Sequence, residues 1–207
     1  MSPSARVGGG WAATRVAGGH TGGMRHELDP DRSTVTVHAS SSLHPITTDA
    51  PVTGWIDMAV DADGRLDAGA PVDGAVEVAL GTMRSGNPLI DREAERRLHI
   101  RRHPTVTGRL TSLSPGRTDA DDAGGADDDD DAGWAGAGAL DFHGVTRPLE
   151  GVLRLTLLPD GEIGLKGAAE LDVTDFGVQP PSLLVVKVHP QIRVELDAVA
   201  FPAPNLS

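Results

Sequence analysis

The segment Gln191-Ile192-Arg193-Val194-Glu195-Leu196-Asp197-Ala198-Val199-Ala200 alternates apolar and polar side chains along most of its length. Successive side chains of a β-strand point to opposite faces of the sheet, so this alternation is typical of a strand with one dry and one wet face. Ile192 and Val194 would lie on the dry face, opposite Arg193 and Glu195. The segment therefore predicts a strand that packs one face against an apolar interior.

Seven further segments predict strands of the same kind. Two of them, residues 149–157 and 162–173, place four large aliphatic side chains on their apolar faces: Leu153, Leu155, Ile163 and Leu165. The alternation is shorter in the other five segments, which are residues 35–39, 52–60, 75–80, 105–113 and 134–142. Eight strands are therefore expected.

Turn-forming residues separate several of these strands. Asp61-Ala62-Asp63-Gly64 and Pro159-Asp160-Gly161 each end in a glycine, which tolerates the positive φ of a tight hairpin. Hairpins make neighbouring strands antiparallel. The fold class predicted is all-β, an eight-stranded antiparallel barrel whose closure removes exposed sheet edges. A two-sheet sandwich fits the alternation equally well.

One short helix is expected near a mouth of the barrel. Asn87 suits the N-cap position and Pro88 the first helical position, and the helix should end near Leu98 because Pro104 restarts an extended chain. Its inward face would carry Leu89, Ile90, Ala94 and Leu98.

Composition limits the classes of protein to which the chain can belong. Its 207 residues contain no cysteine, so disulfides and thiolate zinc sites are excluded. The net charge of −12 is concentrated in residues 119–131, which contain eight aspartates and no Lys or Arg, and the remainder carries only −4. Because the chain has no basic stripe interleaved with aromatic residues, nucleic acid is not an expected partner.

A single domain is predicted over residues 24–201. Residues 1–23 are rich in Gly and Ala and are expected to be a disordered extension, residues 118–132 a disordered acidic insertion, and residues 202–207 a short tail. The N-terminal residues contain no apolar run of the length that a signal peptide needs, and no stretch is long enough for a membrane helix. We therefore expect a cytoplasmic protein without an integral membrane segment.

Residues that could do chemistry do not form a known catalytic pattern. His99 and His103 have the i, i+4 spacing of zinc ligands on a helix, but a third ligand is missing and Pro104 follows directly. The consecutive aspartates 127–131 lack the spacing of a calcium loop. A nucleophile elbow, a P-loop and a dinucleotide fingerprint are also absent from the sequence. No metal, cofactor or catalytic residue is predicted.

Four short motifs occur in a fixed order along the chain. They are Ser42-Leu43-His44-Pro45-Ile46, His103-Pro104-Thr105-Val106-Thr107, Phe142-His143-Gly144-Val145-Thr146-Arg147-Pro148 and Asp175-Phe176-Gly177-Val178. Preceded by Met24-Arg25-His26-Glu27-Leu28-Asp29-Pro30, this order resembles the YceI-like family. The resemblance implies a lipocalin-like β-barrel that holds a long apolar molecule such as a polyisoprenoid, so it favours the barrel over the sandwich. It also implies a symmetric homodimer.

An apolar small molecule is the expected partner. Inward faces of Val, Leu, Ile and Ala, with only three Phe, three Trp and no Tyr in the chain, would leave room inside the barrel. The expected ligand-binding residues are the apolar Leu153, Leu155, Ile163, Leu165, Ile192 and Val194, with His44, a position where the family has a histidine, bonding to a polar head.

The predicted function is therefore non-enzymatic binding, transport or storage of a polyisoprenoid or acyl lipid. Two alternatives stay open at this stage. One is an enzyme that acts on such a lipid with His44 or His143 as the base. The other is a barrel filled by its own side chains that serves as a partner-binding module.

Overall fold

The computed structural model describes residues 23–42, 44–59, 67, 70–115, 133–180, 182–183 and 186–203. Four predicted features lie wholly or largely outside these residues. They are the N-terminal extension up to residue 22, the acidic insertion 118–132, the 61–64 turn and the end of the C-terminal tail.

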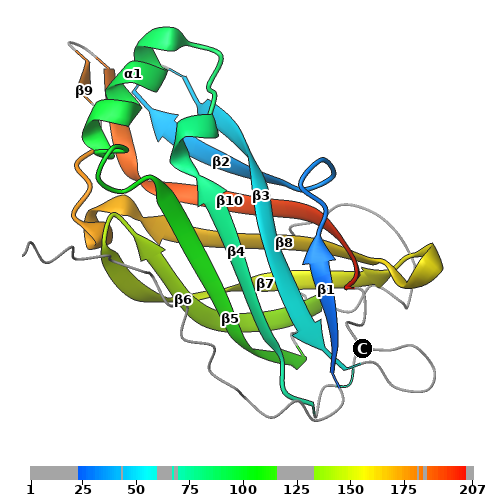
Figure 1. The fold of residues 1–207 in the computed structure, drawn as a ribbon. Coiled ribbons are helices and arrows are strands. Elements are labelled where there is room, and N and C mark those ends of the chain that lie inside the picture. The colour runs from blue at the N-terminus through cyan, green and yellow to red at the C-terminus, as the bar shows by residue number, and fades with distance from the viewer. Residues whose placement is uncertain are drawn as a thin grey trace, which may run out of the picture.

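Eight strands close into an antiparallel barrel (Figure 1). Their order around the barrel is β10 (Val186–Pro202), β2 (Thr34–Ser41), β3 (Ile46–Met58), β4 (Asp73–Ala79), β5 (Thr105–Pro115), β6 (Gly133–Phe142), β7 (Val145–Leu157) and β8 (Ile163–Asp172). The ring closes because β8 pairs with β10, from Asp172 opposite Gln191 to Ile163 opposite Ala200. The predicted eight-stranded barrel is confirmed, and the sandwich is excluded.

Two short strands were not predicted. β1 (Met24–Leu28) pairs with the end of β10 and with β3 from Trp55 onward, whereas β2 pairs with β3 only as far as Pro51. β1 and β2 therefore share one position in the barrel wall. β9 (Ser182–Leu183) pairs with the first residues of β10. Both strands are too short to show a clear alternation in sequence.

Three 3₁₀ turns adjust the predicted strand ends. Leu80 and Val173, both placed in strands by the alternation, begin the turns η1 (Leu80–Thr82) and η3 (Val173–Phe176). The turn η2 (Pro159–Gly161) joins the antiparallel strands β7 and β8, which confirms the hairpin predicted there.

The helix α1 (Pro88–Arg97) begins as predicted, with the Asn87 side chain accepting a hydrogen bond from the Leu89 N–H at 3.0 Å. Ile90, Ala94 and Leu98 recur every four residues and are half-buried. Leu89 was expected on this face, but its side chain is 68% exposed, so that prediction is wrong. Neighbouring residues lie about 100° apart around a helix axis, so Leu89 points away from the half-buried face formed by Ile90, Ala94 and Leu98.

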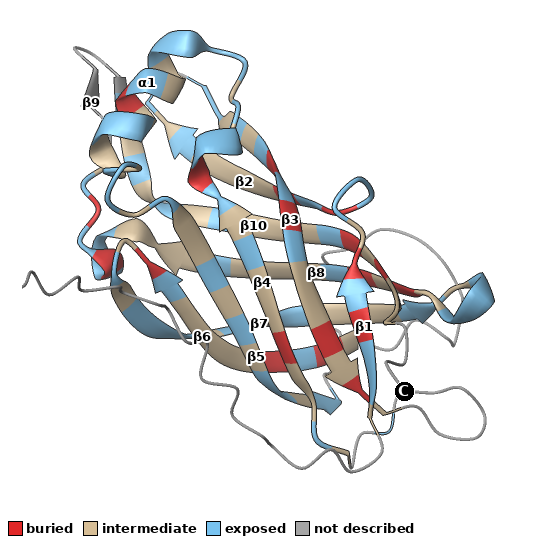
Figure 2. Ribbon diagram, in the orientation of Figure 1, coloured by how far each residue is buried: buried red, intermediate tan, exposed pale blue. Residues whose placement is uncertain are grey.

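Two apolar clusters lie at opposite ends of the barrel (Figure 2). The cluster remote from α1, here called the closed end, contains Leu28, Val52, Ile56, Met58, Ile163 and Leu165 among its buried residues. The cluster near α1, here called the helix end, has Leu80, Phe142, Phe176 and Val178 at its centre. The apolar core is therefore concentrated at the two ends.

Candidate functional site: an apolar cavity in the barrel

A cavity of about 370 Å³ lies within the barrel. Its lining includes Leu28 and Ile56 of the closed end and Leu80 and Phe142 of the helix end, so it occupies the space between the two clusters. This volume falls in the range of small-molecule sites in proteins. Every strand of the closed ring contributes to the lining.

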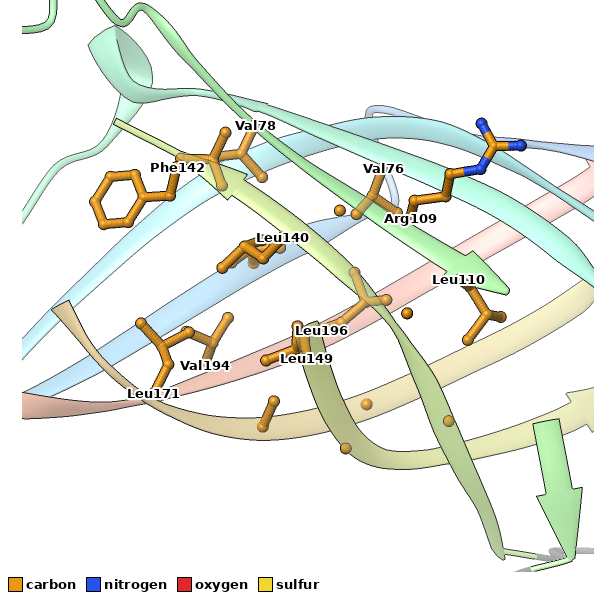
Figure 3. A pocket seen from close by; sticks show the side chains of 18 of the residues that line it. Val76, Val78, Arg109, Leu110, Leu140, Phe142, Leu149, Leu171, Val194 and Leu196 are labelled. Carbon is orange, nitrogen blue, oxygen red and sulfur yellow. The ribbon is translucent and has the colours of Figure 1, made fainter. Parts of the chain in front are cut away.

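The cavity wall is almost entirely apolar (Figure 3). Among the described residues that line it, Arg109 alone has a charged side chain. The Arg109 Nη2 atom donates to Asp73 Oδ2 at 2.6 Å and the side chain is 56% exposed, so its charge lies on the outside of the barrel. A bound molecule would therefore meet apolar side chains and backbone.

Glycines on the strands β5 to β8 keep the interior open. Several cross-strand pairs place a lining glycine opposite a leucine, among them Gly108 with Leu140, Gly138 with Leu149, and Gly167 with Leu153. A Cβ atom at Gly167 would lie 2.8 Å from Leu153 Cδ2, and one at Gly136 would lie 2.9 Å from Leu153 Cδ1. Leu153 thus lies directly over the backbone of two glycines, which have no side chains, and the centre of the barrel stays open.

The structure brings four of the predicted ligand-binding residues to this cavity, namely Leu153, Leu165, Ile192 and Val194. The other two aliphatic residues lie at the closed end. Ile163 is 1% exposed within that cluster, and Leu155 packs against the cluster. Neither residue belongs to the cavity lining.

His44 lies apart from the cavity, in the exposed turn between β2 and β3. Its backbone N–H donates to Ser41 Oγ at 3.2 Å, and Ser41 Oγ donates to the His44 carbonyl at 2.6 Å. These bonds fix the turn through the backbone. A role of the imidazole in binding a ligand's head stays a prediction.

Three histidines meet at the helix end. His143 Nδ1 lies 3.3 Å from the Phe176 carbonyl oxygen, which can only accept, so this nitrogen carries a proton. In the neutral imidazole His143 Nε2 then accepts from His99 Nδ1 at 3.2 Å. The rings of His103 and His143 lie 4.5 Å apart. Burial and the neighbouring His143 lower the pKa of His103 below its ordinary value.

The structure also tests whether His99 and His103, which have the i, i+4 spacing of zinc ligands, lie on one helix face. Both residues follow the end of α1 at Arg97, so they do not share a helix face. Among the described residues, no group of three His, Asp or Glu side chains is placed to hold a metal ion. The histidines instead join the segment after α1 to the turn between β6 and β7.

Sequence reasoning missed the part of the cavity wall formed by β4, β5 and β6. Val76, Val78, Leu110 and Leu140 line the cavity, although none was proposed as a ligand-binding residue. A signal was present, because Val76 and Val78 alternate with Ala75 and Glu77. On β6 the signal is faint, since Gly and Ala occupy both faces.

The YceI-like domain model matches residues 26–200. The chain belongs to the YceI-like family. A search of curated proteins found no match to this YceI-like chain. In the part of the chain that the structure describes, no helix is long and apolar enough to cross a bilayer.

Solved structures share the fold of this YceI-like chain. BcnA of Burkholderia cenocepacia is 12% identical with a TM-score of 0.63, and the match covers 83% of this chain and 98% of BcnA. A polyisoprenoid binding domain from Saccharophagus degradans, implicated in plant cell wall breakdown, is 14% identical with a TM-score of 0.63, covering 87% and 99%. The Campylobacter jejuni YCEI protein is 13% identical with a TM-score of 0.53, covering 77% and 86%. At these identities the likeness shows the fold.

Proposed function

We propose that this chain binds one long apolar or amphiphilic molecule, a polyisoprenoid or an acyl lipid, inside its barrel without chemically changing it. The observation that carries the proposal is the cavity of about 370 Å³ whose interior wall is apolar throughout. A barrel filled by its own side chains would not contain this space. The polyisoprenoid binding domain from Saccharophagus degradans, which shares the fold, supports the same ligand class.

Apolar burial supplies enough free energy for such a ligand. Each methylene removed from water contributes about 0.8 kcal/mol, so ten methylenes contribute about 8 kcal/mol before the entropy cost of association. Neither a prenyl nor an acyl chain needs a polar partner to bind in this way. Affinity should therefore follow chain length and shape more than head-group chemistry.

The lining also favours binding over catalysis. No histidine or carboxylate is among the described lining residues, and the guanidinium of Arg109 faces Asp73 on the outside. General acid–base chemistry requires a titratable group within hydrogen-bonding reach of the reacting atom. The polar head of an amphiphile would accordingly lie at a mouth of the barrel, with its chain in the cavity.

Titration of delipidated protein with a fluorescent 16-carbon fatty acid tests the proposal. We expect saturation at one probe per chain, displacement by farnesol, and a negative heat-capacity change in calorimetry, which is the signature of apolar burial. Absence of saturable binding by both the probe and farnesol would contradict it. Dimerisation and a cytoplasmic location stay predictions, to be checked by analytical ultracentrifugation and by cell fractionation.

A further inference from the structure

The segment around α1, at the helix end of the barrel, is basic although the chain as a whole is acidic. Residues 84–103 contain six arginines against three acidic residues, a surplus of three positive charges in a chain of net charge −12. This segment comprises α1 and the turns on either side of it. The segment around α1 thus carries a local surplus of positive charge at the helix end.

The exposed side of α1 combines an apolar side chain with arginines. Leu89, Arg92 and Arg96 follow one another at spacings of three and four residues, which places them on one helix face. The side chain of Leu89 is 68% exposed and that of Arg96 is 69% exposed. A lipid surface accommodates both kinds of side chain, the leucine at the acyl boundary and the cations at the head groups.

Local acidic residues neutralise only part of this charge, because six arginines face three acidic residues in the segment. Glu93 is bound by Arg96 at 2.7 Å and by Arg97 at 2.8 Å, and the Asp91 carboxylate accepts from Ser85 Oγ at 2.6 Å. Arg101 and Arg102, in the turn after α1, are exposed and form no ion pair with any described residue. We define the basic face as the exposed Leu89, Arg92 and Arg96 of α1 together with Arg101 and Arg102 of the turn that follows it.

The basic face adjoins the cavity. Leu98, the residue that caps α1, lines the cavity, as does Met83 in the segment before α1. Both also pack against the helix-end cluster. A partner seated on the basic face would therefore lie next to the elements that border the apolar interior.

We propose that the basic face docks on an anionic lipid bilayer, and that the cavity exchanges its ligand with that bilayer. Docking rests on charge complementarity and on the exposed leucine, whereas the exchange rests on the proposed function. A nucleic acid fits less well, because the basic face contains no aromatic side chain on which a base could stack. Each arginine near an anionic bilayer surface should strengthen binding about fivefold.

Sedimentation with vesicles of phosphatidylcholine, with or without phosphatidylglycerol, tests the docking. We expect binding to the anionic vesicles only, weakened by salt because the attraction is electrostatic. The double variant Arg101→Gln/Arg102→Gln should bind about 25-fold more weakly. Leu89→Ser should also weaken binding while leaving its salt dependence unchanged, since no charge is removed.

The matched control also removes two positive charges, but from the barrel wall. Arg154 and Lys166 face each other across β7 and β8, so Arg154→Gln/Lys166→Gln should keep vesicle binding within twofold of the wild type. Equal binding to neutral and anionic vesicles, no binding to either, or an equal loss in this control would overturn the proposal. The proposal would also be overturned if the protein bound duplex DNA more tightly than anionic vesicles and Leu89→Ser left the affinity for DNA unchanged.

Transfer kinetics separate the docking from the proposed function. If both hold, the fluorescent fatty acid should leave the protein faster as the concentration of anionic vesicles rises, and Arg101→Gln/Arg102→Gln should slow this transfer. A transfer rate independent of vesicle concentration would contradict exchange at the bilayer. Vesicle docking without any probe binding would instead refute the proposed function and leave the docking surface intact.

Discussion

Replacement of Ala169 by leucine should shorten the ligand that the barrel can hold. Ala169 lies on β8 opposite Val194, and both residues line the cavity. The substitution Ala169→Leu replaces a methyl group by an isobutyl group that projects into the cavity. The added carbon atoms should occupy space otherwise taken by about three methylenes of the ligand.

The expected loss follows from the apolar burial that the ligand forfeits. At about 0.8 kcal/mol per methylene, exclusion of three methylenes costs about 2.4 kcal/mol, a factor of about 50 in dissociation constant. The loss should apply only to ligands long enough to fill the cavity. A ligand about three carbons shorter should bind the variant and the wild type with the same affinity.

A series of saturated fatty acids of increasing length, competing with the fluorescent fatty acid, measures this effect. Wild-type affinity should rise with each methylene until the cavity is full, and the plateau should begin about three carbons earlier in Ala169→Leu. Val194→Ile, which adds one methylene, should shift the plateau by about one carbon.

Ala135→Leu is the matched control for this series. Ala135 lies on the exposed side of β6 and outside the cavity lining, so its replacement should change nothing. A loss of affinity that is independent of chain length, or that equals the loss in Ala135→Leu, would refute the reasoning.

Three further predictions concern the helix end and the turns. Glu93→Gln should lower the free energy of unfolding above pH 5 and leave it unchanged in acid. Two arginines hold the Glu93 pKa at about 2, so the stabilisation that the carboxylate provides is lost as the pH falls from about 4.5 toward 2. Thermal unfolding measured against pH checks this. The free energy of unfolding should also fall as the pH drops below about 6.5, because the His103 pKa is lowered in the folded state. His143→Asn should make this pH dependence shallower in urea unfolding, and asparagine tolerates the φ of 55° at position 143. Gly177→Ala should lower the free energy of unfolding in urea by about 1 kcal/mol, because the φ of Gly177 is 71°. Gly81→Ala should not, although an added Cβ meets no other atom within 4 Å at either position. Equal effects of the two substitutions would contradict this prediction.

The sequence predicted the barrel wherever apolar and charged side chains alternate without interruption. β10 and β8 show this best, because Arg193 and Glu195 face water between aliphatic residues that face inward. The helix was also predictable, since Asn87 and Pro88 fix its first turn. The strands β1 and β9 escaped prediction because their pairing depends on distant strands and their own length shows no pattern.

The cavity depended on tertiary structure and was only partly predictable. Whether apolar side chains fill a barrel or line it is decided by which residues meet across strands, such as Gly167 with Leu153. Likewise His143 reaches His99 only after the barrel has closed. Sequence alternation assigned Ile163 to the apolar face correctly, but it could not indicate that this residue fills the closed end.

Mass spectrometry of the organic extract of natively purified protein tests the binding account most directly. We predict an apolar or amphiphilic compound, prenyl or acyl, at about one molecule per chain, reduced in extracts of Ala169→Leu and retained in those of Ala135→Leu. An extract without such a compound, together with no shift in thermal unfolding when prenyl or acyl lipids are added, would contradict the account.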